Sequence, residues 1–416
     1  MATVGIIGLG YVGLPLAVAF AEEGCEVVAV DADPRKVEAV AAGDSYVEDV
    51  ASDDLRRVGA RIEATTRYQP LSGADAVLIC VPTPLTPNRE PDLGSLIDAS
   101  RALAEVLRRD QLVVLESTTY PGTTRERVAP LLEESGLAAG RDFHLAFSPE
   151  RVDPGRSGYT LRNTPKVLGG LTEACAERAE ALYGLVCDRI VRVSSPEAAE
   201  LTKLLENIFR SVNIALVNEL AMLTDRMGID VWEVVEAAAT KPYGFMRFEP
   251  GPGMGGHCLP VDPFYLSWRA REFDVATEFI ELAGKINQRM PYHCVAKAQR
   301  ALNGAGLSVK GARIVVLGVS YKPGVGDTRE SPALKIIAQL QDLGATVSYH
   351  DPHVPALADP PLQSRPLVEA ISDADLVIIV TAHPEVDHEL VARRSRLVVD
   401  LRGVTRTTSA ANVVRL

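Results

Sequence analysis

Short apolar runs alternate with longer amphipathic stretches over the first 150 residues of the chain. The runs TVGIIG, EVVAV, ADAVLIC and QLVVL each have the length of a buried strand, and glycine or proline soon follows each of them. The stretches between the runs are long enough for helices. Strands that alternate with helices predict a parallel, doubly wound sheet of the Rossmann type.

The region from residue 306 to residue 416 repeats this order of elements. GARIVVLGVSYKPG parallels ATVGIIGLGYVG, and GATVSYHDPHV parallels GCEVVAVDADP. In the same way, ADLVIIVTAHP parallels ADAVLICVPTP, and SRLVVDLRGV parallels DQLVVLESTT. Four matching units in one order predict a second Rossmann-like domain.

A long helix is predicted between the two α/β regions. Ser195 is typical of an N-cap and Pro196 of a first helical position, and the helical pattern runs to about Met227. Its apolar residues recur at helical spacing. They are Leu201, Leu204, Leu205, Ile208, Val212, Leu216, Leu220 and Leu223.

The expected fold class is therefore α/β, with two Rossmann-like doubly wound parallel-sheet domains joined by a long central helix and a helical middle domain. The expected domains are an N-terminal Rossmann domain at 1–194, a central helical domain at 195–305 and a C-terminal Rossmann-like domain at 306–416. The long helix offers a face to a second subunit, so we expect a homodimer.

Three glycines follow the first apolar run in the order G-x-G-x-x-G. Gly8 permits a tight turn, Gly10 lets a pyrophosphate approach the backbone, and Gly13 lets the next helix pack on the strand. Asp31 ends the second run, where an acid accepts hydrogen bonds from a ribose 2′-hydroxyl and repels a 2′-phosphate. A glycine-rich turn without a ligand is the alternative, but the motif, its flanking elements and the acid agree. We therefore predict NAD as the cofactor.

Two further apolar runs end in loops that belong at the same edge of the sheet. Pro82 and Thr83 follow one run, and Ser117 and Thr118 follow another. Parallel-sheet folds bind ligands at the carboxyl ends of their strands, so these residues are expected near the cofactor. A loop-capping role is the alternative for Thr118.

The first turn of the second α/β region lacks the glycine motif and carries Lys322. Arg329 follows in GDTRESPAL, and Arg402 ends the last strand in DLRG. Cationic side chains at strand ends suit a second, phosphate-bearing ligand. Solvated surface charge is the alternative.

Lys203 and Asn207 lie four residues apart on the long helix and so share one face. An ammonium group beside an amide can hold the oxygen of a reacting hydroxyl or an oxyanion. The spacing alone favours the alternative, which is an exposed polar pair on an amphipathic helix.

The loop GPGMGGHCLPVDPF sets Cys258 behind glycines, whereas the other five cysteines lie in apolar strand-like or helix-like segments. A metal-ligand role has His257 in its favour, but adjacent residues rarely chelate one ion. A nucleophile fits better, because glycines permit close approach of a substrate and nearby positive charge lowers a thiol pKa. Asp262 follows four residues later and is suited to position or deprotonate a water.

An NAD site together with a nucleophilic thiol predicts a four-electron oxidation. One hydride transfer turns an alcohol into an aldehyde, and thiolate attack gives a thiohemiacetal. A second hydride transfer leaves a thioester, which water releases as a carboxylate. An ordinary alcohol dehydrogenase needs no such thiol.

The net charge of −12 argues against nucleic acid as a partner, because proteins that bind phosphate backbones carry basic surfaces. No apolar run approaches the roughly 18 residues of a membrane span, and no basic leader precedes the first strand. The cysteines form no CxxC pair and no zinc spacing. We expect a cytoplasmic protein without a metal site and without membrane contact.

The motifs GLGYVGLPLA, STTYPGTT, FSPERVDPG, GGHCLPVDPF and SYKPGVGDTRESPAL together resemble the UDP-glucose/GDP-mannose 6-dehydrogenase family, and the likeness reaches as far as Arg402. This family oxidises C6 of a nucleotide-activated hexose to a uronate with two NAD⁺. The resemblance implies that Cys258 is the nucleophile and that Asp262 and Thr118 order the catalytic water. It also implies Glu150 as general base on the thioester, with Lys203 and Asn207 at the C6 oxygen.

The resemblance also implies two sets of binding residues. Those for NAD are Gly8, Gly10, Tyr11, Val12, Gly13, Asp31, Lys36, Pro82, Thr83, Ser117, Thr118 and Arg329. Those for the UDP-sugar or another nucleotide sugar are Glu150, Arg151, Lys203, Asn207, Gly255, Tyr321, Lys322 and Arg402.

Within the family, GGHCxPxDPFYL and STTYPGTT are most similar to UDP-N-acetylglucosamine 6-dehydrogenases, with the N-acetylmannosamine enzymes next. Val261 stands where the glucose and mannose branches commonly carry a lysine, and the family's second glutamate has no counterpart in SPERVDPG. Asp153 is the nearest acid, and we assign it no role.

We expect a UDP-N-acetyl-D-glucosamine 6-dehydrogenase, with UDP-N-acetylmannosamine, UDP-glucose or TDP-glucose as alternative substrates. A two-electron dehydrogenase of the 3-hydroxyacid type and a non-enzymatic nucleotide sensor are the remoter alternatives.

Overall fold

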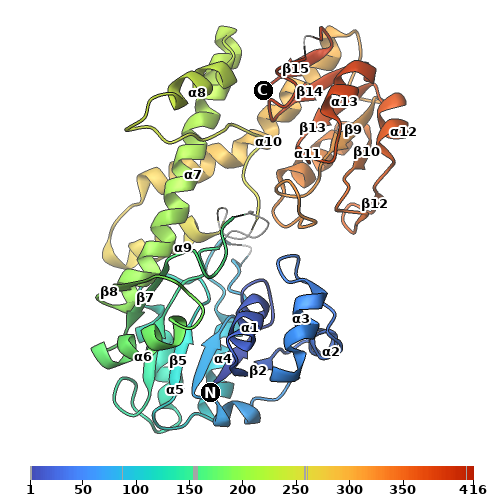
Figure 1. Cartoon of the computed structure of the whole chain (residues 1–416). Helices are drawn as coiled ribbons and strands as arrows, with labels where there is room; N and C mark the ends of the chain where they lie inside the picture. The colour runs from blue at the N-terminus through green and yellow to red at the C-terminus, as the bar shows by residue number, and fades with distance from the viewer. Residues whose placement is uncertain (1, 87, 153–157, 257–258, 260, 409) are drawn as a thin grey trace. The chain divides into compact units, whose positions relative to one another are not determined.

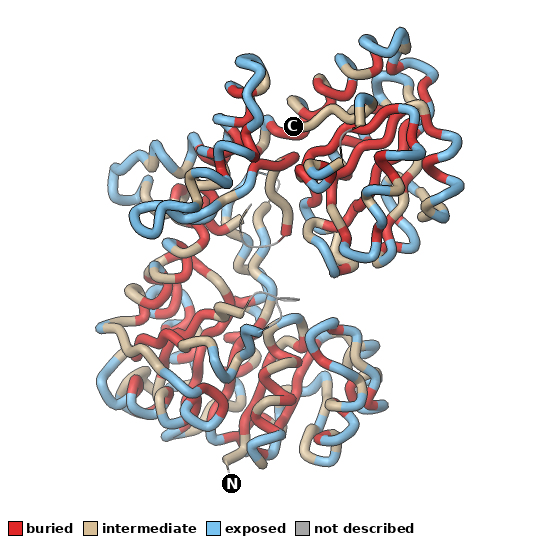
Figure 2. The backbone as a smooth tube through the Cα atoms, turned by 45° about the horizontal axis from the view of Figure 1, so that its top comes forward, coloured by how far each residue is buried: buried red, intermediate tan, exposed pale blue. Residues whose placement is uncertain are grey.

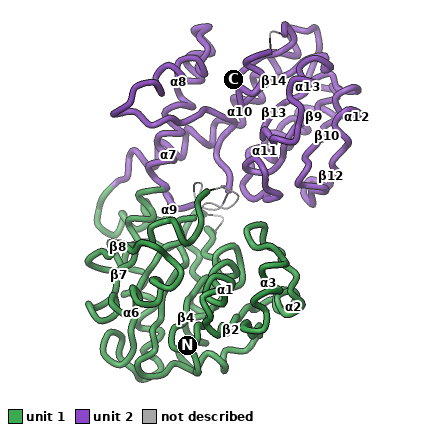
Figure 3. The backbone as a smooth tube through the Cα atoms, viewed as in Figure 1, with its two compact units in different colours: residues 1–206, 264–275 green, residues 207–263, 276–416 purple. Residues whose placement is uncertain are grey.

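The structure is a computed structural model that describes residues 2–86, 88–152, 158–256, 259, 261–408 and 410–416 (Figure 1). By compactness the chain forms two units, residues 1–206 with 264–275 and residues 207–263 with 276–416 (Figure 3). Each unit contains one large sheet. The division into three domains at residues 194 and 305 stays a prediction.

The first unit contains an eight-stranded sheet in the order β3-β2-β1-β4-β5-β6-β7-β8. Its neighbouring strands run parallel except β6 and β7, which are antiparallel. The strands are β1 (Thr3–Ile7), β2 (Glu26–Val30), β3 (Ile62–Thr65), β4 (Ala76–Ile79), β5 (Leu112–Leu115), β6 (His144–Phe147), β7 (Lys166–Gly170) and β8 (Ile190–Val193). The helices between them are α1 (Gly13–Glu22), α2 (Pro34–Ala42), α3 (Ser52–Val58), α4 (Gly94–Ala104), α5 (Ala129–Glu133) and α6 (Glu173–Tyr183).

The second unit contains a five-stranded sheet in the order β10-β9-β13-β14-β15, with every neighbouring pair parallel. Its strands are β9 (Arg313–Leu317), β10 (Thr346–His350), β13 (Leu376–Ile379), β14 (Val398–Asp400) and β15 (Val413–Arg415), besides the small pair β11 (Ala356–Leu357) and β12 (Leu362–Gln363). Its helices are α8 (Val231–Ala239), α10 (Glu278–Gly304), α11 (Pro332–Asp342), α12 (Leu367–Ser372) and α13 (His388–Arg394). The order matches β2-β1-β4-β5-β6 of the first sheet, so the predicted α/β fold with two Rossmann-like domains is confirmed.

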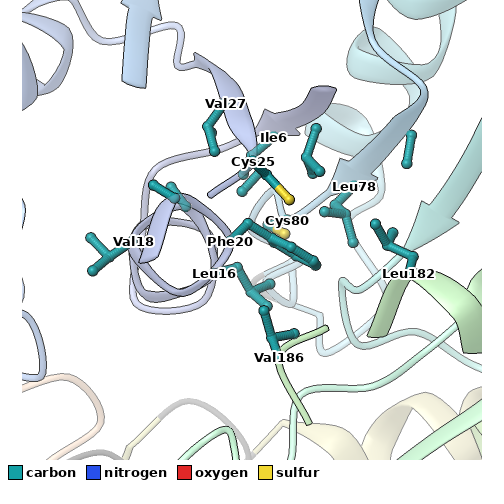
Figure 4. Close-up of a cluster of buried hydrophobic side chains, with 14 of the residues drawn as sticks. Ile6, Leu16, Val18, Phe20, Cys25, Val27, Leu78, Cys80, Leu182 and Val186 are labelled. Atoms are coloured by element: carbon teal, nitrogen blue, oxygen red, sulfur yellow. The ribbon is translucent and has the colours of Figure 1, made fainter. Parts of the chain in front are cut away.

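Apolar side chains cover both faces of each sheet, as parallel sheets require. Along β1, Ile6 points into one buried cluster and Ile7 into the other, because successive strand side chains alternate between faces. The strands are accordingly buried segments between more exposed loops (Figure 2). Cys25 and Cys80 lie among the apolar side chains of the first cluster (Figure 4). They behave as small core residues, as predicted from their sequence context.

The long helix predicted in the middle of the chain is α7 (Pro196–Met227). Ser195 Oγ accepts a hydrogen bond from the Ala198 N–H at 3.3 Å, so the predicted N-cap is confirmed. The short helix α9 (Asp262–Ala270) follows the glycine-rich loop. Within the described part of the chain, no helix is long and apolar enough to cross a membrane.

Candidate active site

The glycine turn after β1 has the geometry that a dinucleotide requires. Gly8 has a φ of +96°, and a Cβ there would lie 2.6 Å from the Cys80 carbonyl oxygen. A Cβ on Gly13 would lie 1.8 Å from the Gly8 oxygen, so α1 can approach the turn this closely only without a side chain. A Cβ on Gly10 would meet no described atom within 4 Å, and Tyr11 and Val12 then lead into α1. The turn therefore fits a pyrophosphate at Gly10 and at the N-terminus of α1.

Asp31 lies directly beside this turn and organises it. Its Oδ2 accepts hydrogen bonds from the Leu9 N–H at 2.7 Å and from Lys36 Nζ at 3.1 Å, while Oδ1 accepts one from the Asp33 N–H at 2.9 Å. A carboxylate has about four lone-pair sites, so one remains available beside these contacts for a ribose hydroxyl. The predicted acid thus lies at the end of β2, next to the glycines.

The loops after β4 and β5 meet, as their strand order predicts. Thr83 Oγ1 donates to the Thr118 carbonyl oxygen at 2.7 Å, and Ser117 Oγ donates to the Val81 oxygen at 2.7 Å. Pro82 stands between Val81 and Thr83 in the loop after β4. The structure therefore brings the four predicted loop residues together at the carboxyl ends of two neighbouring parallel strands.

A buried carboxylate from α7 holds the loop that follows Thr118. Glu200 accepts hydrogen bonds from the Gly122 N–H at 2.6 Å, and from the N–H and hydroxyl of Thr124 at 2.8 and 2.7 Å. Burial nevertheless raises the pKa of Glu200 to about 7, against the lowering effect of these donors. In the sequence Glu200 is one polar position of an amphipathic helix, so its role was not predicted.

Two predicted catalytic residues of the first unit are in contact. Lys203 Nζ, on α7, donates to the backbone oxygen of Glu150 at 2.6 Å, and both residues are largely buried. Glu150 Oε1 accepts hydrogen bonds from the N–H groups of Arg151 and Val152 at 2.7 and 2.5 Å. The Arg151 guanidinium instead pairs with Glu206 at 2.6 Å. The alternative of an exposed polar position on α7 is thereby excluded for Lys203, which is 9% exposed.

Two other predicted catalytic residues, Asn207 and Asp262, are in contact in the second unit. Asn207 Nδ2 donates to Asp262 Oδ2 at 2.5 Å, and the two side chains are 4% and 2% exposed. Asp262 is the first residue of α9, where a carboxylate is stabilised by the helix dipole. A buried carboxylate with an amide donor is suited to hold a water or a hydroxyl group.

The glycine-rich loop lies against the first turn of the second sheet. A Cβ on Gly255 would lie 2.7 Å from Tyr321 Cβ, and the Gly256 N–H donates to the Arg329 carbonyl oxygen at 3.0 Å. The Arg329 side chain itself pairs with Asp327. Lys322 Nζ lies 5.6 Å from the centre of the Tyr321 ring. The structure thus brings together four residues that sequence reasoning had assigned to two ligands.

The Arg402 side chain lies against Gly251, the first residue of the glycine-rich loop. A Cβ on Gly251 would be 2.7 Å from Arg402 Nη1, and Arg402 Nε donates to the Val380 oxygen at 2.7 Å. The Gly251 N–H donates to Asn218 Oδ1 at 2.9 Å, and Asn218 Nδ2 donates to Asn287 Oδ1 at 2.9 Å. This buried amide pair tethers the loop to α7 and α10, and nothing in its sequence setting marked it.

Cys258, His257 and Asp153 lie outside the described residues. The nucleophile role predicted for Cys258 therefore stays a prediction. The flanking residues that are described, Gly255, Gly256 and Asp262, fix the two ends of its loop within the second unit.

Comparison with known proteins supports the same chemistry across the chain. The NAD binding domain, central domain and UDP binding domain of the UDP-glucose/GDP-mannose dehydrogenase family match residues 2–186, 197–289 and 315–407. The chain is similar to UDP-N-acetyl-D-mannosamine dehydrogenase of Pyrococcus horikoshii, with 37% identity over 99% of this chain and 98% of that protein.

Two further relatives agree with this match. UDP-N-acetyl-D-glucosamine 6-dehydrogenase of Pseudomonas aeruginosa is 36% identical over 85% of this chain and 83% of that protein. The solved structure of UDP-D-ManNAc dehydrogenase from Pyrococcus horikoshii has a TM-score of 0.91 at 36% identity, covering 99% of this chain and 98% of that one. With the glycine turn and the buried polar pairs in place, the chain belongs to the UDP-glucose/GDP-mannose dehydrogenase family and is an NAD-dependent nucleotide-sugar dehydrogenase.

Proposed function

We propose that the chain oxidises the C6 hydroxyl of UDP-N-acetyl-D-glucosamine to the uronate, in a four-electron reaction with NAD. The reacting carbon is carried as a thiohemiacetal and then as a thioester on Cys258. Its epimer UDP-N-acetylmannosamine is the second candidate, because the Pyrococcus horikoshii relative matches 99% of this chain. UDP-glucose and TDP-glucose are the remaining alternatives.

The contact between Lys203 and Glu150 is the observation that carries this proposal. An ammonium group has three N–H donors, and the Glu150 carbonyl takes one at 2.6 Å. In the proposed reaction, Lys203 stabilises charge that develops on the C6 oxygen, and Glu150 accepts a proton from water during thioester hydrolysis.

Asn207 orients the Asp262 carboxylate. The resemblance to the family assigns the ordering of the catalytic water to Asp262 and Thr118. Gly8, Gly10, Gly13 and Asp31 hold the cofactor in the proposed reaction, and bound NAD supplies the hydride acceptor.

A substrate panel tests the proposal. Purified protein is incubated with NAD and with UDP-GlcNAc, UDP-ManNAc, UDP-glucose or TDP-glucose, and NADH absorbance is recorded. We expect the highest kcat/KM with UDP-GlcNAc, and a higher value with another sugar would reassign the substrate. Cys258→Ser is expected to lose turnover while it keeps binding of NAD and UDP-GlcNAc; uronate formation at the wild-type rate would contradict the nucleophile.

We further propose that α7 forms the interface of a homodimer. Seven apolar side chains spaced three, four or seven residues apart are exposed along this helix, and an exposed apolar face of this length is typical of an interaction site. They are Leu201, Leu205, Phe209, Leu216, Leu220, Leu223 and Met227. Size-exclusion chromatography with light scattering should give the mass of a dimer, and a monomer at micromolar concentration would remove the proposal.

A further inference from the structure

A buried lysine that no predicted site includes lies beside the Glu150 carboxylate. Lys166 is the first residue of β7 and is 2% exposed. Its Nζ lies 2.8 Å from Glu116 Oε2 and 3.6 Å from Glu150 Oε2. Glu116, the residue after β5, is fully buried and also accepts a hydrogen bond from the Tyr183 hydroxyl.

The direction of one strand explains how these groups meet. β5 and β6 run parallel, so Glu116 and Glu150 follow strands that end at the same edge of the sheet. β7 runs antiparallel to β6, so its first residue lies at that edge too. An ordinary parallel crossover would put Lys166 at the opposite edge, far from both carboxylates.

The charge of Lys166 is maintained by these carboxylates. Burial opposes the charged form, but Glu116 and Glu150 outweigh it and raise the pKa of Lys166 above its usual value. Glu116 has its pKa raised by burial, against the lowering effect of Lys166. Desolvation of a buried ion pair is costly unless the two ions are close and hydrogen-bonded, as Lys166 and Glu116 are at 2.8 Å.

We propose that Lys166 is a positioning residue for Glu150. Its ammonium group holds Oε2, while the N–H groups of Arg151 and Val152 hold Oε1, so the carboxylate is kept in one orientation. This inference rests on the proposed function, in which Glu150 is the base for thioester hydrolysis. There, a water oxygen forms a bond to the acyl carbon, its proton passes to Glu150, and the acyl C–S bond breaks with release of the Cys258 thiolate.

Removal of the ammonium group takes away the cation that pairs with Glu150 Oε2 among the described residues. The titratable and charged groups that face it from the surrounding elements are Lys166, Glu116, Cys80, Cys187, Arg151 and, through the Glu150 backbone oxygen, Lys203. Of these, Lys166 is the cation closest to the carboxylate oxygens.

The test compares Lys166→Met with Lys166→Arg, which keeps the cation. Two quantities are measured: kcat, and acyl-enzyme detected by intact-protein mass spectrometry after acid quench. In Lys166→Met the kcat should fall at least about tenfold, and the acyl-enzyme should accumulate during turnover, because a misplaced general base slows hydrolysis of the thioester. Lys166→Arg should keep kcat within about twofold of the wild-type value and show no accumulation.

Two further variants separate this role from a structural one. Glu116→Gln/Lys166→Met removes both buried charges together, so it should fold even where the single variant does not, and it should show the same accumulation of acyl-enzyme. Lys297→Met removes another buried lysine, which pairs with Asp225 in the second unit, and should leave kcat and the acyl-enzyme level unchanged.

The outcomes distinguish the two proposals. A folded Lys166→Met or double variant with the wild-type kcat and no accumulated acyl-enzyme overturns the positioning role, while uronate formation by the wild-type protein upholds the proposed function. A wild-type protein that forms no uronate from any nucleotide sugar overturns both.

Discussion

The variant Gly10→Ala tests the role of the glycine turn in cofactor binding separately from its role in folding. A Cβ at this position meets no described protein atom within 4 Å, and the backbone does not need a positive φ there. The substitution should therefore leave the melting temperature unchanged or slightly raised. Alanine lowers the conformational entropy of the unfolded chain, which stabilises the folded state by about 0.4–1 kcal/mol. The methyl group would instead occupy the space through which a pyrophosphate approaches the backbone.

The loss of affinity can be estimated from the added methyl group. Forcing such a group into a close contact costs about 1–3 kcal/mol, which corresponds to a roughly 5- to 150-fold rise in the Kd for NAD. Isothermal titration calorimetry with NAD measures it, and differential scanning calorimetry records stability on the same samples. Wild-type NAD affinity in Gly10→Ala would refute the assignment of the pyrophosphate to this turn.

Two matched glycines provide the controls. Gly13→Ala places a Cβ 1.8 Å from the Gly8 oxygen, and relief of that clash should cost about 3 kcal/mol, or roughly 6–12 °C in a domain of this size. Gly59 has helical backbone angles and open space, so Gly59→Ala should preserve both stability and NAD affinity. Equal melting temperatures for the Gly13 and Gly59 variants would contradict the packing described for α1.

Three other predictions follow from single contacts. Burial raises the pKa of Glu200 from 4.5 to about 7, so the folded state keeps a proton that the unfolded state loses. The free energy of unfolding of the wild type should therefore fall by up to about 3 kcal/mol between pH 4.5 and 7. Urea unfolding should show no such pH dependence in Glu200→Gln, and the same dependence in that variant would contradict the assignment. Asp31→Ala removes the acceptor of the Leu9 N–H and the charge that repels a 2′-phosphate, so kcat/KM with NAD should fall at least about tenfold relative to that with NADP, and an unchanged ratio would exclude this role. Leu220→Glu buries a charge in the proposed dimer interface, so light scattering should find monomer, whereas an intact dimer would place the interface elsewhere.

Both sheets were predictable from the sequence because buried parallel strands appear as continuous apolar runs, each followed by a turn residue. The turn at Gly8, the loops at Thr83 and Ser117 and the N-cap at Ser195 follow from local chemistry, so short motifs identify them. The comparisons confirm the family and the cofactor that these motifs predicted.

Other parts of the site depend on contacts between distant segments. The apolar run KVLGG predicts a strand but not its direction, and only the antiparallel entry of β7 brings Lys166 to Glu150. Glu200 and Asn218 appear in the sequence as polar positions of a long helix, while their partners lie 76 and 33 residues away. The role of Cys258, which lies outside the described residues, remains a prediction from its loop.

The stoichiometry of NADH tests the central claim most directly. A limiting amount of UDP-GlcNAc is oxidised to completion with excess NAD, NADH is measured by absorbance, and the sugar product is identified by mass spectrometry. Four-electron oxidation through the Cys258 thioester predicts two NADH for each UDP-GlcNAc consumed, with the uronate as product. A ratio of one NADH, with the C6 aldehyde as the released product, would contradict it.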